Sequence, residues 1–227
     1  MKAAALLLAA LAGSALGAGG MYAAGRASDR SMVRDYLLAH PEVIPEAMNK
    51  LQERERSKAV AAAGDAITKP YGSAWAGNPN GDVTLVEYYD YNCGFCRASL
   101  PTVAKLLSRD PKLKVVFREL PVIAPTSRDA ARASLAAASQ GKFRAFHDAL
   151  YAAGPVTPAS IAAAAAKAGV SVPSHDKAAD AEITRNIRTA AELGVTGTPS
   201  WVVGNQLLIG AQDLADLERA IAQARRG

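Results

Sequence analysis

The feature that most constrains the fold is an apolar strand that ends at a pair of cysteines. Residues 83–91 are mostly β-branched or aromatic, which is typical of a strand covered on both faces. Cys93 and Cys96, the only cysteines of the chain, follow it, and residues 97–109 have the pattern of a helix. Free N–H groups and the helix dipole favour an anion at a helix start, and the thiolate is the reactive form of cysteine. The sequence therefore predicts a redox-active Cys93–Cys96 pair.

The later segments predict an α/β domain over residues 83–227. A second strand at 113–120 would complete a right-handed parallel βαβ unit with the first strand and its helix. Residues 126–193 are expected to be helical throughout, and we interpret them as an inserted helical subdomain. A hairpin over 200–209 and a helix over 212–224 follow.

The N-terminus has the features of an export signal. Residues 1–24 carry one charge, on Lys2, followed by an apolar run and small residues. An uncleaved membrane anchor is the alternative, because the apolar stretch is long. In an exported chain, two cysteines so close together would close almost no loop, so they are not expected to act as a stabilising disulfide.

Residues 25–67 are expected to form a helical arm, and residues 68–82, which are rich in glycine and proline, a linker. The arm has two apolar stripes at helical spacing, formed by Val33, Tyr36 and Leu37, and by Ile44, Ala47, Met48 and Leu51. These are too few for a separate core. We interpret the arm as an oligomerisation segment, and the alternative is a helix folded back on its own domain.

Several functional classes are disfavoured. The net charge of +5 is not concentrated in clusters, which argues against a nucleic-acid partner. Structural zinc needs four ligands, and His40, His147 and His175 lack ligand spacing. Covalent haem attachment would need histidine after Cys96, where Arg97 stands. We therefore expect no cofactor and no resident metal.

The position of each cysteine predicts its role. Cys93 should lie exposed at the helix start, have the lower pKa and attack a substrate disulfide, whereas Cys96, one turn later, should be buried and resolve the mixed disulfide. Arg97 is expected either to add positive potential or to be an ordinary solvated residue.

A carboxylate lies within the apolar strand. Side-chain alternation places Glu87 on the same face as Tyr89 and Tyr91. If this face lies under the helix, Glu87 is a buried acid that exchanges protons with the resolving cysteine; the alternative is a partly exposed residue at a strand edge. Asp90 and Asn92 are interpreted as polar rim or capping residues.

A second informative stretch precedes the hairpin. Pro199 follows a glycine-containing turn and comes directly before a strand, which favours a cis peptide bond after Thr198. The alternative is an ordinary trans turn. A cis bond would expose the backbone of Thr198 beside the cysteines, where a substrate chain could pair with it. We expect Thr198, with Gly94 and Phe95, to contact substrate.

These motifs together resemble a known family. The run Glu-Tyr-Tyr-Asp-Tyr-Asn-Cys-Gly-Phe-Cys at 87–96, the Gly-Thr-Pro at 197–199 and the helical insertion resemble the DsbA-like thioredoxin-fold oxidoreductases of the bacterial envelope. Residues 35–44 resemble the N-terminal region of the ScsC-type subgroup, which can hold subunits together. The resemblance implies a periplasmic location, a thioredoxin-like sheet, Cys93 as nucleophile and Cys96 as resolving thiol. It also implies a buried acid at Glu87 and a cis-proline at Pro199.

The dipeptide between the cysteines departs from the strongly oxidising members, which have Pro-His where this chain has Gly94-Phe95. We expect a milder couple, and therefore an oligomeric disulfide isomerase or reductase, a dimer or trimer, that acts on exported proteins with cysteines. A membrane thiol-redox protein would be its partner. The alternatives are a DsbA-type dithiol oxidase with a quinone-linked membrane acceptor, and a copper-stress protein that binds Cu(I) through Cys93 and Cys96, because thiolates are soft ligands.

Overall fold

The computed structural model describes residues 32–226, and the chain divides into two compact units, Met1–Glu53 and Arg54–Gly227. The predicted signal segment lies outside the described residues. No helix within residues 32–226 is both long enough and apolar enough to span a bilayer.

The first unit is helical over residues 32–39 and, after a turn, from the start of α2 (Val43–Ala63). Most of its large apolar side chains are about half exposed or more, and they are Met32, Val33, Tyr36, Leu38, Ile44, Met48 and Leu51. Because a single chain leaves these side chains in contact with water, the described part of this unit, residues 32–53, has no hydrophobic core of its own.

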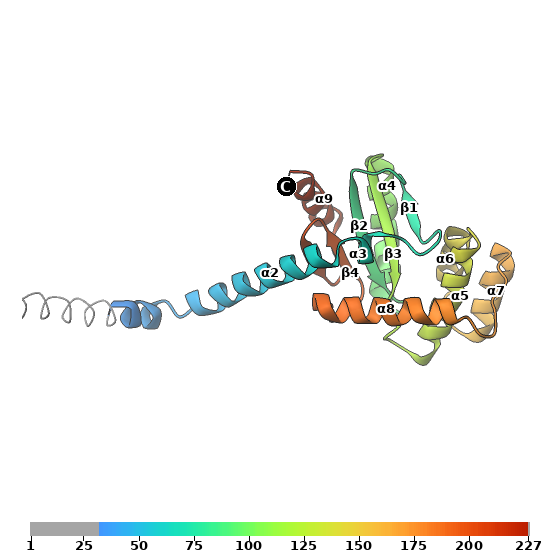
Figure 1. Ribbon diagram of the computed structural model, residues 1–227, viewed down its shortest axis with the longest axis horizontal. Helices are drawn as coiled ribbons and strands as arrows, with labels where there is room; N and C mark the ends of the chain where they lie inside the picture. The colour runs from blue at the N-terminus through green and yellow to red at the C-terminus, as the bar shows by residue number, and fades with distance from the viewer. Residues whose placement is uncertain (1–31, 227) are drawn as a thin grey trace, which may run out of the picture. The chain divides into compact units, whose positions relative to one another are not determined.

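The second unit is built on a five-stranded mixed sheet in the order β1-β3-β2-β4-β5 (Figure 1). The strands are β1 (Trp75–Gly77), β2 (Val83–Tyr89), β3 (Leu113–Glu119), β4 (Ser200–Val203) and β5 (Gln206–Ile209). The central strands β2 and β3 are parallel and joined through α4 (Gly94–Arg109), as the βαβ pattern predicts. The other neighbouring pairs are antiparallel.

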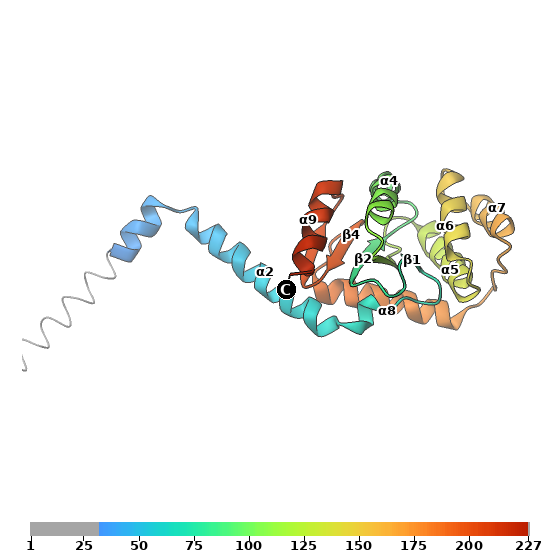
Figure 2. The same ribbon diagram turned by 90° about the horizontal axis from the view of Figure 1, so that it is seen from above.

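Helices cover both faces of the sheet, which is why β2 is buried along nearly its whole length. Figure 2 shows α4 and α9 (Leu214–Ala224) on one side of the strands and α8 (Lys177–Leu193) on the other. On the α4 side, Leu85 and Trp201 belong to the larger core. On the α8 side, Val86 and Val202 pack with Leu193 of α8.

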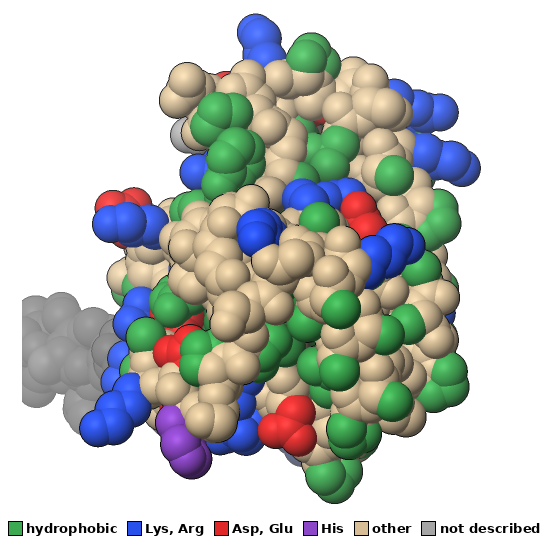
Figure 3. All heavy atoms as spheres, turned by 90° about the vertical axis from the view of Figure 1, so that its right-hand side faces the viewer, with side chains coloured by type: hydrophobic (Ala, Val, Ile, Leu, Met, Phe, Trp, Pro, Cys, Tyr) green, Lys and Arg blue, Asp and Glu red, His purple; other side chains and the backbone are tan. Residues whose placement is uncertain are grey.

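The helical insertion is confirmed. It consists of α5 (Pro125–Ser139), α6 (Phe143–Ala152), α7 (Pro158–Ala168) and α8. Thr157 caps α7 by accepting a hydrogen bond from the Ser160 amide, and Gly194 ends α8 in the left-handed conformation. Viewed from the side of the insertion, apolar side chains form small separate groups among polar surface (Figure 3). The fold is therefore thioredoxin-like with a helical insertion, as predicted.

The structure corrects the prediction of a linker over 68–82. This stretch contains the edge strand β1, and Ala74 beside it is buried. A Cβ on Gly72 would lie 2.4 Å from the Ala138 carbonyl oxygen, and one on Gly77 equally close to that of Leu113. The glycines of this stretch therefore allow close backbone approach rather than flexibility.

The boundary of the second unit also lies earlier than expected, within α2. Val60 near the end of α2 and Ile67 in α3 (Asp65–Thr68) are buried against the α8 side of the sheet. Hydrophobic contact thus makes the end of the predicted arm part of the second unit.

Candidate active site

Cys93 lies at the start of α4. It is the N-cap residue of the helix, and its Sγ accepts a hydrogen bond from the Cys96 amide over 3.4 Å. Its thiol donates to the Thr198 carbonyl oxygen over 3.1 Å. The expectation that Cys93 is exposed is wrong, since only 6% of the residue is accessible. The loop that carries Thr198 covers Cys93. Because Thr198 lies 105 residues away in the sequence, local sequence patterns do not predict this contact.

Cys96 lies deeper, with 1% accessible, as its place one turn along the helix predicts. Burial raises the pKa of the Cys96 thiol far above its usual range, and the nearby Glu87 carboxylate adds to this effect. The two sulfurs therefore differ in environment: the Cys93 sulfur accepts an amide at a helix N-terminus, and the Cys96 thiol holds its proton.

Glu87 is buried in the centre of the sheet. It is paired in register with Phe117 of β3 and Trp201 of β4, and only 4% of it is accessible. The alternative of a partly exposed edge residue is therefore wrong. Burial raises the pKa of Glu87 to about 8, the charge of Cys93 contributes next, and Arg144 opposes both. At neutral pH this carboxyl group is mostly protonated.

The Thr198–Pro199 peptide bond is cis, as predicted, and it immediately precedes β4. Ser200 supports the turn by donating its hydroxyl to the Gly197 carbonyl over 2.7 Å. The structure thus brings Thr198 to Cys93. Of the two residues between the cysteines, Gly94 has open space where a Cβ would lie, and Phe95 is 68% exposed.

Arg97 is tied to the helical insertion. Its guanidinium donates to the carbonyl oxygens of Tyr151 and Gly154 and lies 5.3 Å from the centre of the Tyr151 ring. The interpretation as an ordinary solvated residue is therefore wrong. Arg97 fastens the first turn of α4, next to the cysteines, to the end of α6.

Asp90 is the residue that sequence reasoning most underestimated. It is 1% accessible, so it is not a rim residue. Its carboxylate accepts hydrogen bonds from Asn92, Val122, Ile123 and Ser127. A carboxylate between a buried strand and a helix start could have indicated a structural role for Asp90. Its hydrogen-bond partners between β3 and α5, however, are identified only by the tertiary structure.

A polar cluster, consisting of Tyr89, Tyr91, Glu119, Ser134 and His147, fills the space between the sheet and the insertion. Burial is the main cause that raises the pKa of Glu119 well above its usual range. Burial likewise lowers the pKa of His147 to about 3, so this imidazole is neutral at physiological pH. These residues come from β2 and the turn that follows it, from β3, and from α5 and α6, and no sequence motif joins them.

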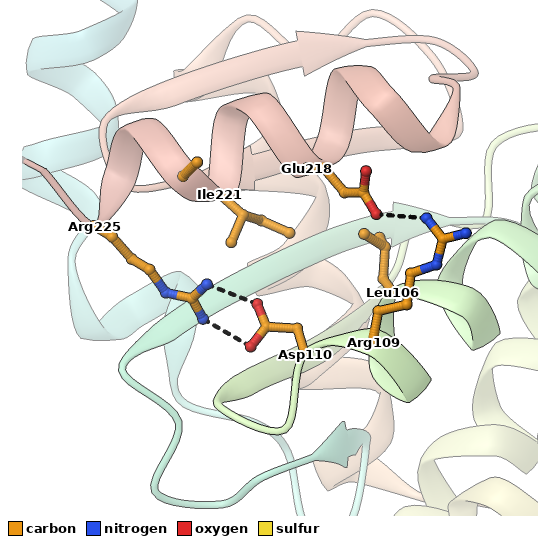
Figure 4. Close-up of a pocket in the computed structure, with 7 residues that line it drawn as sticks. Leu106, Arg109, Asp110, Glu218, Ile221 and Arg225 are labelled. Atoms are coloured by element: carbon orange, nitrogen blue, oxygen red, sulfur yellow. Dashed lines mark hydrogen bonds and ion pairs between the residues drawn. The ribbon is translucent and has the colours of Figure 1, made fainter.

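The far end of α4 carries a separate cavity of about 300 Å³ between α4 and α9 (Figure 4). Its charged side chains are paired, Arg225 with Asp110 and Arg109 with Glu218. It begins at Leu106, which is thirteen residues along the helix from Cys93, or roughly 20 Å. This cavity is therefore not part of the cysteine site.

Comparison with known proteins agrees with this geometry. The model of the DSBA-like thioredoxin domain matches residues 84–222, and that of the copper resistance protein ScsC N-terminal domain matches residues 30–58. A linker-deletion mutant of ScsC from Proteus mirabilis superposes with a TM-score of 0.72 at 27% identity, over 86% of this chain and 92% of that one. A periplasmic thioredoxin-like protein from Salmonella enterica serovar Typhimurium has a TM-score of 0.66 at 29% identity, over 72% and 95%.

Curated relatives of known name are much longer proteins. The chain is 30% identical over 153 residues to the Na⁺/H⁺ antiporter NhaA 1 of Salinispora arenicola, which is 64% of this chain and 24% of that protein. The chain thus spans about a quarter of the length of such relatives. The match to the DsbA-like model, by contrast, covers more than half of this chain and includes both cysteines and Pro199. The chain therefore belongs to the DsbA-like thioredoxin domain family.

Proposed function

We propose that Cys93 and Cys96 are the redox pair and that the protein exchanges disulfides with exported proteins in the periplasm. The observation that carries this proposal is the position of the Cys93 sulfur, at the N-terminus of α4 and 3.1 Å from the Thr198 carbonyl. A client chain that replaced the thiol as partner of this backbone would bring its own sulfur to Cys93. The periplasmic location is supported by the predicted signal segment and by the Salmonella relative.

The exchange begins with one common step, which is followed by a second step that differs between isomerisation and reduction. The Cys93 thiolate attacks one sulfur of a client disulfide, a mixed disulfide forms, and the other client sulfur leaves as a thiolate. In isomerisation, a second client thiolate attacks the client sulfur of the mixed disulfide and releases Cys93, so no net oxidation occurs. In reduction, Cys96 attacks Cys93, the client leaves as a thiol, and the enzyme keeps a Cys93–Cys96 disulfide that a membrane thiol-redox protein must reduce.

Glu87 is proposed to exchange a proton with the Cys96 thiol. Cys96 must lose its proton before it can attack, and burial opposes this loss. A neighbouring carboxyl group whose pKa is raised to about 8 is ionised in a minority of molecules at neutral pH, and in those molecules it can accept the Cys96 proton. Glu87 is thus assigned the role of the buried acid and base of the site.

We favour isomerase or reductase activity in an oligomer. The Gly94-Phe95 pair places no cationic side chain between the cysteines to stabilise the Cys93 thiolate, and this supports a couple that is easily kept reduced. The exposed apolar side chains of the first unit support subunit association, since they lack an internal core. A dimer or trimer would hide them and present several redox sites to one client.

The test is refolding of a model protein with scrambled disulfides. The reduced enzyme should restore native activity in catalytic amounts, and Cys93→Ser should abolish this. Cys96→Ser should accumulate a mixed disulfide with the client, seen by mass spectrometry. Fast oxidation of client thiols without reshuffling would instead establish the dithiol oxidase.

The oligomer is tested separately. Light scattering should show an oligomer that becomes monomeric without residues 25–53, and a full-length monomer would exclude the assembly.

Copper binding is the second candidate, because residues 30–58 match a domain named after copper resistance. Within residues 32–226 no three His, Cys, Asp or Glu side chains gather into a metal site, so the two thiols would be the donors. Thiolate sulfur is a soft ligand that suits Cu(I), and the metal would be carried as cargo rather than held as a cofactor. Reduced protein titrated with Cu(I) should retain it after desalting, and Cys93→Ser should not; loss of copper from the unaltered chain excludes this role.

A further inference from the structure

The buried carboxylate of Asp90 joins two loops at the active-site end of the sheet. Its Oδ1 atom accepts hydrogen bonds from the Asn92 amide and the Ser127 hydroxyl, each over 2.8 Å. Its Oδ2 atom accepts from the amides of Val122 and Ile123, each over 2.9 Å. One side of the carboxylate therefore holds the turn before Cys93, and the other holds the β3–α5 loop.

Backbone contacts strengthen the link between Asp90 and the cysteine turn. The Cys93 amide donates to the Asp90 carbonyl over 3.0 Å, and the Tyr151 hydroxyl donates to the same oxygen over 3.3 Å. The Asn92 side chain, next to Cys93 in the chain, donates to the Ser127 hydroxyl over 2.9 Å. The β3–α5 loop and the Cys93 amide are thus both hydrogen-bonded to the same residue, Asp90.

This loop exposes apolar side chains that the fold does not use. Val122 is 55% exposed and Ile123 is 53% exposed, although their amides are held in place by Asp90. Phe95, on the other side of Cys93 in the chain, is also exposed. Exposed aliphatic side chains on an immobilised loop next to a reactive thiol are typical of a contact surface rather than of the core.

We propose that Val122 and Ile123 form an apolar ledge that binds the client polypeptide next to its cysteine, and that Asp90 is the positioning residue that holds this ledge against Cys93. The occupant is an unfolded, apolar segment of a client, because the sulfur of that client must reach Cys93 while its flanking residues extend over the neighbouring loop. The inference rests on the proposed function and names what the site selects: apolar polypeptide rather than small disulfides.

The experiment compares two substrates, a scrambled model protein and the small disulfide 5,5′-dithiobis(2-nitrobenzoate). Val122→Ser with Ile123→Ser should lower kcat/KM for the protein about tenfold relative to that for the small disulfide, mainly through KM, because the client loses apolar contact area. The matched control is Val172→Ser with Ile187→Ser, which alters the exposed aliphatic residues elsewhere in this unit. Its ratio should equal that of the unaltered protein.

Asp90 is tested by removal and by conservative replacement. Asp90→Ala should lower the same ratio about tenfold, because both loop amides lose their acceptor. Asp90→Asn should restore part of it, since its oxygen can still accept the Val122 and Ile123 amides, whereas its amino group can no longer accept the Asn92 amide or the Ser127 hydroxyl. An unchanged ratio in the ledge variant, or an equal loss for both substrates in Asp90→Ala, would overturn the proposal.

A binding measurement separates this proposal from the proposed function. In a Cys93→Ser, Cys96→Ser background, fluorescence anisotropy would follow binding of a labelled apolar peptide that has serine in place of its cysteine. The ledge substitutions should raise Kd about tenfold, and equal Kd values would refute the ledge. If the unaltered enzyme exchanges neither substrate but binds the peptide through the ledge, the redox function fails and the ledge stands.

Discussion

The buried glutamate makes the stability of the reduced protein depend on pH in a direction that can be measured. Glu87 has an ordinary pKa near 4.5 and a pKa of about 8 in the folded protein, chiefly because burial disfavours its charge. Between these values the unfolded chain has released the Glu87 proton and the folded protein has kept it. The contribution of Glu87 to folding stability therefore falls as pH rises from 4.5 to 8.

The size of the effect follows from the shift. From pH 4.5 to pH 7 the raised pKa costs up to about 3 kcal/mol of unfolding free energy. Glu87→Gln fills the same space with a group that does not titrate. The variant should match the unaltered protein near pH 4.5 and exceed its stability by up to about 3 kcal/mol at pH 7.

The assay is urea unfolding of the reduced proteins at pH 4.5, 6, 7 and 8, followed by circular dichroism. The difference between the two proteins isolates Glu87, because other titrating groups cancel. Glu192→Gln is the matched control: Glu192 lies on α8 with its side chain 64% exposed, and its substitution should change stability by a few tenths of a kcal/mol at every pH. Parallel pH profiles for Glu87→Gln and the unaltered protein would refute the reasoning.

Two further predictions concern buried groups away from the cysteines. Arg118→Met should destabilise the protein by about 3 kcal/mol, because the buried Glu182 carboxylate loses the guanidinium that lies 2.6 Å from it. Adding Glu182→Met should recover at least half of this loss in urea unfolding. His147→Phe should cost about 1 kcal/mol at pH 7 through the lost contact with Tyr91. Below pH 6.5 the unfolded chain binds a proton at His147, whereas the folded protein, with its His147 pKa of about 3, does not, so His147 lowers stability as pH falls. His147→Phe should remove this fall in stability. An unchanged slope of stability against pH below 6.5 would contradict this.

The local parts of the site were readable in the sequence because short-range rules determine them. An apolar run predicts β2, the position of Cys93 predicts a helix N-cap, and a proline before a strand predicts the bond that precedes Pro199. Alternation along β2 placed Glu87 on the correct face. Each of these inferences needs only neighbours in the chain.

The expectations that failed were those that depend on contacts between distant segments. The glycines of 68–82 suggested a flexible linker, but Gly77 lies against the Leu113 carbonyl and the stretch joins the sheet. Cys93 was expected to be exposed, but the loop of Thr198 covers it. Composition cannot distinguish a glycine that bends freely from one that lets two backbones meet.

The sequence alone therefore determined the fold class, the order of the elements and the identity of the two thiols, because secondary-structure periodicity and the cysteine spacing are local properties. Only the tertiary structure decided how strongly Glu87 and Cys96 are desolvated, and only it showed that Asp90 connects the cysteine turn to Val122 and Ile123. Desolvation depends on every atom packed around a group, and a hydrogen bond between loops more than thirty residues apart exists only once the sheet has brought them together.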